Sequence, residues 1–214
     1  MKKSDIFDDL GKKEIKAEDL AKRIIKNPDL LSEVYDGISS GKARIKFKSA
    51  KILRIISDKN PKMLYPKMDF FISLLDSENK IIKWNSMDVI ANLTFVDSKN
   101  KFDKIFEKYY GFLYEGSLIT AGHVVDNSGK IANAKPNLQS KITSELLKVE
   151  KIPLPTEECR NILLGKVILS FSQYIDQVKD KEKMISLAKE QINNTRNATR
   201  KKAEKFLKKF GSMD

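Results

Sequence analysis

The chain contains a single histidine, His123, and Asp126 follows it three residues later on the same face of any helix that holds both. A base beside a carboxylate could serve an ionisable role. A zinc site, however, needs a third protein ligand, and nucleophilic catalysis needs a Ser or Cys arrangement that cannot be read around His123. Cys159 is the only cysteine, so neither an intramolecular disulfide nor a Cys-based metal site is possible. We therefore expect a structural histidine and assign no catalytic residue, metal or cofactor.

Two other spacings superficially suggest chemistry. The segment "GHVVDNSGK" has the glycines and lysine of a phosphate-binding loop, but six residues separate Gly122 from Gly129, Ile131 replaces the required Ser or Thr, and no strand precedes it. Trp84 and Asp88 are four residues apart, which places an aromatic ring beside a carboxylate on one helix. Trp84 also shares a face with Met87 and Ala91, as core packing predicts.

The net charge of +12 is concentrated in two stretches of the 214-residue chain. Residues 42–54 and 196–209 each carry +6, so the rest of the chain is balanced. Hydrophobic residues make up 41% and charged residues 33%, which excludes a disordered chain and a membrane protein. Acids interrupt the first ten residues, so they do not read as a signal peptide, and no apolar run approaches the roughly 18 residues of a membrane span. We expect a cytoplasmic protein.

Helical periodicity runs through nearly the whole sequence. Polar turns and the prolines Pro28, Pro61 and Pro136 punctuate it, because proline ends one helix and favours the first turn of the next. These signals predict about eleven helices, at residues 17–27, 29–38, 42–57, 62–75, 79–95, 101–114, 117–134, 137–150, 156–176, 181–192 and 195–210. The fold class is therefore all-α.

Several of these helices carry apolar residues on two faces, so they must lie between neighbours. "SAKILRIIS" aligns with "SMDVIANLT" at a shift of 37, and similar patterns recur at shifts of roughly 30 to 45. With "LYPKMDFFISLLDSENKIIKWNSMDVIANLTFVD", the chain resembles the HEAT/armadillo-like solenoid superfamily. The resemblance implies a right-handed α-α superhelix of about five helical hairpins. We expect one repeat domain over residues 17–211, a flexible or weakly ordered N-terminus over 1–16 and a tail over 212–214.

The resemblance also implies a binding surface, because corresponding faces of successive inner helices line the concave side of a solenoid. Each inner helix carries polar residues on a third face, and together these would form a ladder: Arg44, Lys48, Lys51, Asn85, Asp88, Asn92, Thr120, His123, Asn127, Lys166, Ser170 and Gln173. Such rungs could hydrogen-bond the backbone of an extended peptide. We therefore expect a non-enzymatic scaffold for an unknown protein or peptide, although any solvated face must also be polar.

Two alternatives remain open. A nucleic-acid binder would use the two basic stretches, the second of which contains Arg196, Arg200, Lys201, Lys202, Lys205 and Lys209. A DNA glycosylase is a third possibility, since the HEAT-like alkylpurine glycosylases are similar in using an aromatic and an acid on inner helices, as Trp84 and Asp88 would be. The last helix also reads as a solvated cap of the array, with Gly211 as its C-cap. The sequence predicts no membrane partner and no oligomeric state.

Overall fold

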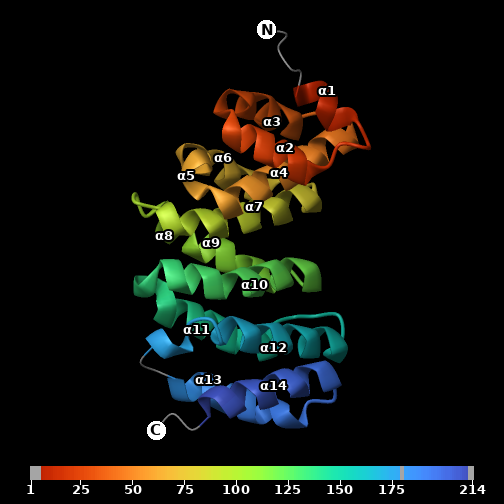
Figure 1. The fold of residues 1–214 in the computed structure, drawn as a ribbon. Coiled ribbons are helices and arrows are strands. Elements are labelled where there is room, and N and C mark those ends of the chain that lie inside the picture. Colours follow the sequence, from red (N-terminus) through yellow and green to blue (C-terminus); the bar gives the residue numbers. More distant parts are fainter. Residues whose placement is uncertain (1–5, 179–180, 212–214) are drawn as a thin grey trace. The chain divides into compact units, whose positions relative to one another are not determined.

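The computed structural model describes residues 6–178 and 181–211, and every regular element in these ranges is an α-helix or a short 3-10 helix. The contacts between residues divide the chain into two compact units, residues 1–99 and 100–214. Both are built in the same way, from pairs of helices stacked along the chain (Figure 1). The expectation of an all-α fold is confirmed.

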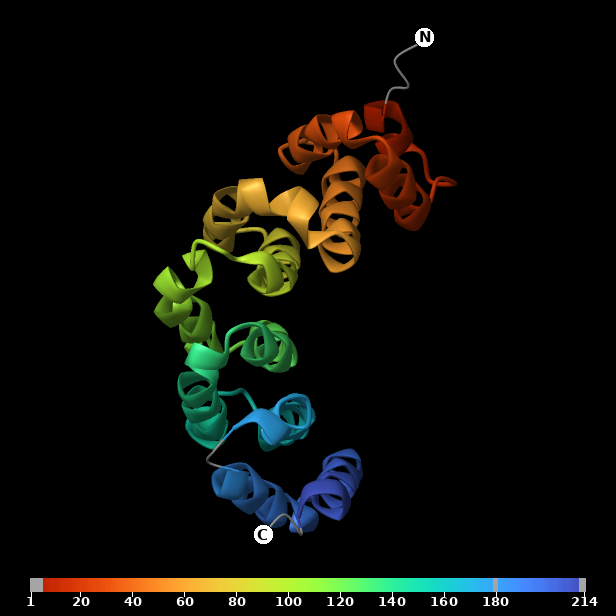
Figure 2. The same ribbon diagram turned by 60° about the vertical axis from the view of Figure 1, so that its left-hand side comes forward.

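The first unit contains three helices that lie in a common row, here called the inner row: α2 (Ala17–Lys26), α4 (Ala43–Lys59) and α7 (Lys80–Leu93). The central helix α4 packs against α2, against α7 and against α3 (Leu31–Ile38). The elements α3, α5 (Pro61–Leu64) and α6 (Met68–Ser73) form the outer row (Figure 2). Short 3-10 turns connect the helices, at Pro28–Leu30, Tyr65–Lys67, Leu74–Asp76 and Thr94–Val96.

The second unit repeats this arrangement. Its inner row is α10 (Leu118–Ala134), α12 (Glu157–Phe171) and α14 (Asn197–Phe210), in which α12 packs against both neighbours. Its outer row is α8 (Lys101–Lys104), α9 (Phe106–Gly111), α11 (Gln139–Leu147) and α13 (Lys181–Glu190), as Figure 2 shows. The 3-10 turns of this unit are Phe112–Tyr114, Pro136–Leu138, Lys148–Lys151, Ile175–Gln177 and Gln191–Asn193.

Each of the eleven predicted ranges contains a helix, but the outer helices are more broken than the sequence analysis predicted. The range 62–75 holds α5, a 3-10 turn and α6 in succession. Pro66 lies inside that turn, and because proline has no backbone N–H it interrupts the hydrogen-bond ladder of an α-helix. Local chemistry therefore accounts for this break.

The N-terminal segment differs from the expected flexible stretch over 1–16. Residues Ile6–Gly11 form α1, which packs against α3 and α4, and the side chains of Ile6 and Leu10 are 0% exposed. The following loop is held by α4, because Arg44 Nη1 donates to the Gly11 carbonyl at 3.3 Å and Lys48 Nζ to the Ile15 carbonyl at 2.9 Å. Two buried apolar side chains four residues apart, together with the ion pair between Asp9 and Arg23, anchor this short helix. Residues 1–5 and 212–214 lie outside the described ranges, and the single repeat domain over 17–211 stays a prediction.

The final helix α14 has the two faces that its sequence indicated. Thr199, Ala203, Phe206 and Phe210 are buried against α12 and α13, whereas Lys201, Lys205, Lys208 and Lys209 are exposed. Gly211 follows as the C-cap, and its N–H donates to the Leu207 carbonyl at 2.7 Å. Its φ of −75° is right-handed, so this cap does not use the left-handed conformation that favours glycine. None of the described helices combines the length and apolar character needed to cross a bilayer.

Gly129 is one of the glycines that superficially suggested a phosphate loop, and the structure gives it a packing role. A methyl group at this position of α10 would lie 2.9 Å from the Ser170 carbonyl oxygen and 2.6 Å from Gln173 Cδ, both of the neighbouring inner-row helix or its end. Contacts this short force a shift in the backbone of α12. The absence of a side chain therefore lets α10 and α12 approach each other closely.

We expect Gly129→Ala to lower the free energy of unfolding by about 1 kcal/mol, because overpacking costs about 1 to 3 kcal/mol and the gain in helix propensity returns about 1. The matched control is Gly111→Ala in α9, where no atom lies within 4 Å of the added methyl group. That variant should be unchanged or up to about 1 kcal/mol more stable. Urea unfolding of both proteins tests this, and a stabilised Gly129→Ala protein would contradict close packing at this site.

Candidate functional site

The solvent-facing positions of the inner row form a regular pattern in the second unit. On each helix they recur at spacings of four, three and four residues, which is one narrow stripe of a 3.6-residue helix. All of them are exposed or half-buried. We call this set the inner-row face of the second unit: Ile119, His123, Asp126 and Lys130 on α10; Ile162, Lys166 and Leu169 on α12, with Gln173 just beyond its end; Ala198, Lys202, Lys205 and Lys209 on α14.

Four residues of the predicted ladder are buried and do not lie on such a face. Thr120 (2% exposed), Asn127 (6%) and Ser170 (1%) each directly follow a residue of the exposed stripe, so their side chains point to the sides where inner-row helices pack together. Asn92 (6%) lies near the end of α7, where its amide donates to Ser57 Oγ of α4 at 2.9 Å. The exposed arc of an inner helix is narrow because neighbours flank it on both sides. The remaining ladder residues are exposed or half-buried.

Ion pairs join successive inner-row helices in the first unit. Lys51 Nζ of α4 lies 2.7 Å from Glu18 Oε1 of α2, and this hydrogen bond lowers the pKa of Glu18. Arg54 Nη1 lies 3.4 Å from Asp88 Oδ2 of α7. Together with the contacts of Arg44 and Lys48 to the α1–α2 loop, these pairs occupy four of the six basic residues of the 42–54 stretch. That stretch is largely engaged within the fold.

The second unit has pairs of the same kind. Lys166 Nζ of α12 forms an ion pair with the Asp126 carboxylate of α10, and Arg196 pairs with Glu158 of α12. Asn133 at the end of α10 donates through its amide to the Gln173 carbonyl at 3.0 Å. Each of these links joins residues about one repeat apart. These polar side chains are therefore held in defined positions by the neighbouring helix.

Two lysines lie across glycines of the preceding inner-row helix. A methyl group on Gly122 of α10 would lie 3.6 Å from Lys166 Cε, and one on Gly165 of α12 would lie 3.3 Å from Lys202 Cδ and 3.4 Å from its Nζ. Lys166 and Lys202 thus occupy equivalent troughs where the helix before them has no side chain. Burial, together with the neighbouring Lys166 ammonium, lowers the pKa of Lys202.

The structure divides the second predicted basic patch into engaged and solvated cations. Arg196 is paired with Glu158, and Arg200 donates to the Asn194 carbonyl at 3.0 Å near the start of α14. Lys201, Lys205 and Lys209 are exposed, and the Lys209 ammonium lies 4.7 Å from the centre of the Phe210 ring. Lys202, Lys205 and Lys209 share the inner-row face, whereas Lys201 points to a different side of the helix.

The residues first considered for chemistry lie in the surroundings of a packed helical array. His123 is half-buried, and the Asp126 carboxylate is ion-paired with Lys166. Trp84 is half-buried beside the fully buried Met87 and Ala91, while Asp88 accepts from Arg54. Cys159 lies in the first turn of α12, where its N–H donates to Thr156 Oγ1. Among residues 6–178 and 181–211, no three His, Cys, Asp or Glu side chains are grouped as a metal site requires.

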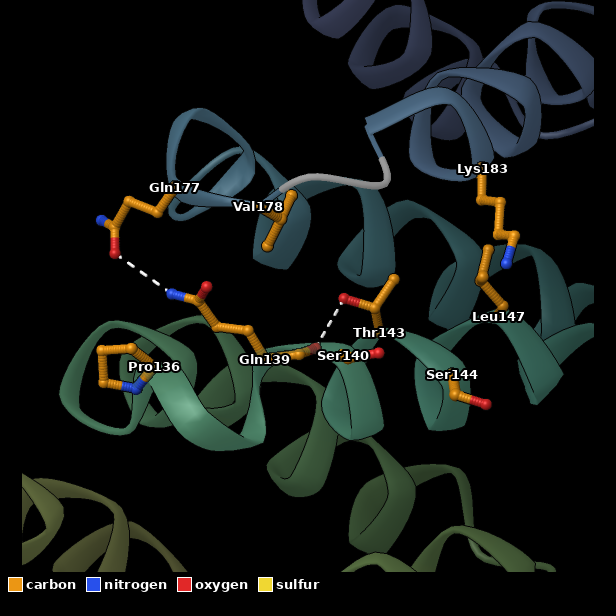
Figure 3. A pocket seen from close by; sticks show the side chains of 9 residues that line it. All are labelled: Pro136, Gln139, Ser140, Thr143, Ser144, Leu147, Gln177, Val178 and Lys183. Atoms are coloured by element: carbon orange, nitrogen blue, oxygen red, sulfur yellow. Dashed lines mark hydrogen bonds between the residues drawn. The ribbon is translucent and has the colours of Figure 1, made fainter.

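A cavity of about 540 Å³ lies on the outer row of the second unit (Figure 3). Its two buried polar side chains are already hydrogen-bonded within the fold. Gln139 Nε2 donates to the Ala132 carbonyl at 3.1 Å and to Gln177 Oε1 at 3.2 Å, and Thr143 Oγ1 donates to the Gln139 carbonyl at 2.8 Å. The full lining is Pro136, Gln139, Ser140, Thr143, Ser144, Leu147, Gln177, Val178 and Lys183. The lining of this groove is mostly polar, and its buried polar side chains already have hydrogen-bond partners within the fold.

The charged partners that fix the inner row, and the apolar residues beside them, were not among the predicted site residues. Glu18 and Glu158 were not singled out, and Arg54 counted only as part of the basic stretch 42–54, although opposite charges about one repeat apart were a readable signal for their pairs. Two large apolar side chains also lie on the inner-row face, Ile119 at 55% exposure and Leu169 at 44%. An exposed aliphatic residue on an otherwise polar stripe is a second signal that the pattern contained.

No family model matches the sequence, and no curated protein matches it. Solved structures do match: a designed armadillo repeat protein has a TM-score of 0.58 at 15% identity, over 88% of this chain and 84% of that chain. A second engineered protein has a TM-score of 0.57 at 15% identity, over 92% of this chain and 89% of that chain. At this identity the similarity concerns the fold alone. The chain has the armadillo/HEAT-like all-α solenoid fold.

Proposed function

We propose that this chain is a non-enzymatic protein-interaction module that holds a segment of another protein along its inner-row helices. The observation that carries the proposal is the inner-row face of the second unit, where polar side chains surround the exposed Ile119 and Leu169. Apolar anchors within a polar rim are the usual composition of a protein-binding surface. The solenoid fold supports the proposal, because stacked helical repeats present such extended surfaces.

The cross-helix ion pairs support binding in a second way. A side chain that must be immobilised when a partner binds costs about 0.5 to 1.5 kcal/mol, and this cost falls when the side chain is already held. Lys166 is held by Asp126, and Gln173 lies against the position of Gly129. The inner-row face therefore loses comparatively little conformational entropy when it orders a peptide.

Nucleic acid has less support as the ligand. A duplex needs a continuous run of unpaired cations, because phosphate neutralisation supplies most of the affinity. Arg44, Lys48, Lys51 and Arg54 are engaged within the first unit. On the second unit, the Asp126 carboxylate and the exposed Leu169 side chain interrupt the basic face.

The test is a selection of binders from a random peptide library, followed by affinity measurements on two matched variants. Ile119→Arg/Leu169→Arg places two charges on the inner-row face, whereas Tyr114→Arg/Ile192→Arg places them on exposed apolar residues of outer-row turns. We expect the selected peptides to bind the first variant about tenfold more weakly or worse, a loss of about 1.4 kcal/mol. The second variant should bind as the unaltered protein does.

A selection without binders would count against the proposal. So would binders that are lost equally in both variants, because the inner-row face would then have no special part. A variant in which Lys201, Lys202, Lys205 and Lys209 are all replaced by Gln tests the nucleic-acid alternative. Tight duplex binding whose salt slope falls by up to about 3.6 in that variant would support the alternative instead.

A further inference from the structure

The three inner-row helices of the second unit can be aligned residue by residue. His123, Lys166 and Lys202 occupy the same position on α10, α12 and α14, since each begins the same pattern of exposed residues three and seven positions later. Glycine precedes the first two, and the lysine of the next helix lies across it in both cases: Lys166 across Gly122 and Lys202 across Gly165. The two lysines are therefore structural equivalents.

The equivalence of Lys166 and Lys202 also predicts which residue of the preceding helix should carry a carboxylate opposite each lysine. Lys166 pairs with Asp126, which is three residues after His123 on the preceding helix. The corresponding position for Lys202 is three residues after Lys166, and it holds Leu169, which is 44% exposed. Lys202 forms no ion pair with any other residue in the described ranges 6–178 and 181–211. A leucine thus stands where the repeat pattern places the acid.

The surroundings make Lys202 receptive to an added negative charge. Lys202 is half-buried over Gly165, and the charges nearest to it include two cations, Lys166 and Arg196, and one acid, Asp126. Burial and these cations lower the pKa of Lys202, so its charged form is less favourable than that of an exposed lysine. An opposing carboxylate would relieve that disadvantage. Lys205 and Lys209 extend the same stripe and attract an anion to it.

We propose that Lys202 and Leu169 form a docking point for a partner peptide that presents an acidic side chain next to an apolar one. The carboxylate takes the place of the acid that α12 does not supply, and the apolar side chain covers Leu169. The inference rests on the proposed function, because it names the class of peptide that the inner-row face holds. A peptide fits better than a phosphate backbone, since a phosphate backbone offers nothing to cover an exposed leucine.

The experiment measures binding of the full chain to labelled peptides of alternating Glu and Leu in a Gly-Ser host. The comparison probes are the same peptide with Gln for Glu and a labelled DNA duplex. We expect the Glu–Leu peptide to bind about tenfold more tightly than the Gln–Leu peptide, as loss of a charge-assisted hydrogen bond predicts. The duplex should bind more weakly than the acidic peptide at physiological salt.

Three variants test whether the preference for the acidic peptide depends on Lys202. Lys202→Gln should weaken binding of the acidic peptide about tenfold, whereas Lys201→Gln, which removes the same charge from another side of the same helix, should change it little. Leu169→Asp supplies the missing acid from within the chain, so it should also abolish the preference for Glu over Gln. In that variant the pKa of Lys202, followed by NMR of its side chain, should rise. Urea unfolding checks that all three proteins remain folded.

The outcomes separate this inference from the function on which it rests. Binding of both peptides with equal affinity, or an equal loss in Lys201→Gln and Lys202→Gln, would overturn the docking point while leaving a peptide-binding face in place. An unchanged pKa of Lys202 in Leu169→Asp would also overturn it, because the two positions would then not face each other. Tighter binding of the duplex than of either peptide would overturn both proposals.

Discussion

Shortening Leu93 to Ala is expected to lower the free energy of unfolding by about 2 to 5 kcal/mol, and Leu53→Ala by a similar amount. Both side chains are essentially fully buried, Leu93 on α7 at 0% exposure and Leu53 on α4 at 1%. Their helices pack against each other as consecutive members of the inner row. Removing the side chain leaves a cavity that the packed helices fill only in part. The loss of stability therefore exceeds the free energy of transferring the removed methyl groups from the core to water.

The control lies on the same helix as Leu93. Ile81 of α7 is 42% exposed, so Ile81→Ala removes a comparable aliphatic group that fills no space in the core. We expect this change, like the change of Gln173 to Ala on the exposed stripe of the second unit, to cost less than about 0.5 kcal/mol. Urea titrations measure all four proteins. Equal losses for Leu93→Ala and Ile81→Ala would show that the buried and exposed faces of α7 are assigned wrongly.

Lys135→Met is expected to lower the free energy of unfolding by about 3 kcal/mol. The Lys135 side chain, at the end of α10, is 6% exposed and lies 3.0 Å from Asp103 Oδ2 of α8. Its ammonium also donates to Asn100 Oδ1 at 2.8 Å. Removal of one member of a buried ion pair leaves the charge of its partner uncompensated, which costs about 3 to 5 kcal/mol. The Asp103 side chain is 24% exposed, so we expect the lower end of this range.

Two further variants test the physical reason. Lys148→Met removes a lysine whose side chain is 52% exposed from its pair with Glu145, and it should cost no more than about 0.5 kcal/mol. Adding Asp103→Asn to Lys135→Met should recover part of the lost stability, because no unpaired carboxylate remains. Thermal or urea unfolding of the single and double variants completes the cycle. A double variant that is no more stable than Lys135→Met would argue that shape, and not charge, is the contribution of Lys135.

The amino-acid sequence by itself determined where the helices lie and which of them are inner helices. Leu53, Leu93 and the buried face of α14 are where apolar spacing predicted, because the 3.6-residue period of a helix is a local property. The armadillo/HEAT-like fold followed from the repetition of that pattern. The broken outer helix at Pro66 and the short helix α1 escaped prediction, although the proline and the pair Ile6 and Leu10 were both visible in the sequence.

Only the tertiary structure decided which polar residues face solvent and what each charge meets. Asn127 and Ser170 are buried while Asp126 and Leu169, one residue before each, are exposed, because one step along a helix turns a side chain by about 100°. Whether that turn leads to water or to a neighbour depends on a helix about one repeat away. The same holds for Lys166 and Lys202. The residue opposite each ammonium belongs to the preceding inner-row helix, and the sequence around each lysine does not show which residue of that helix it is.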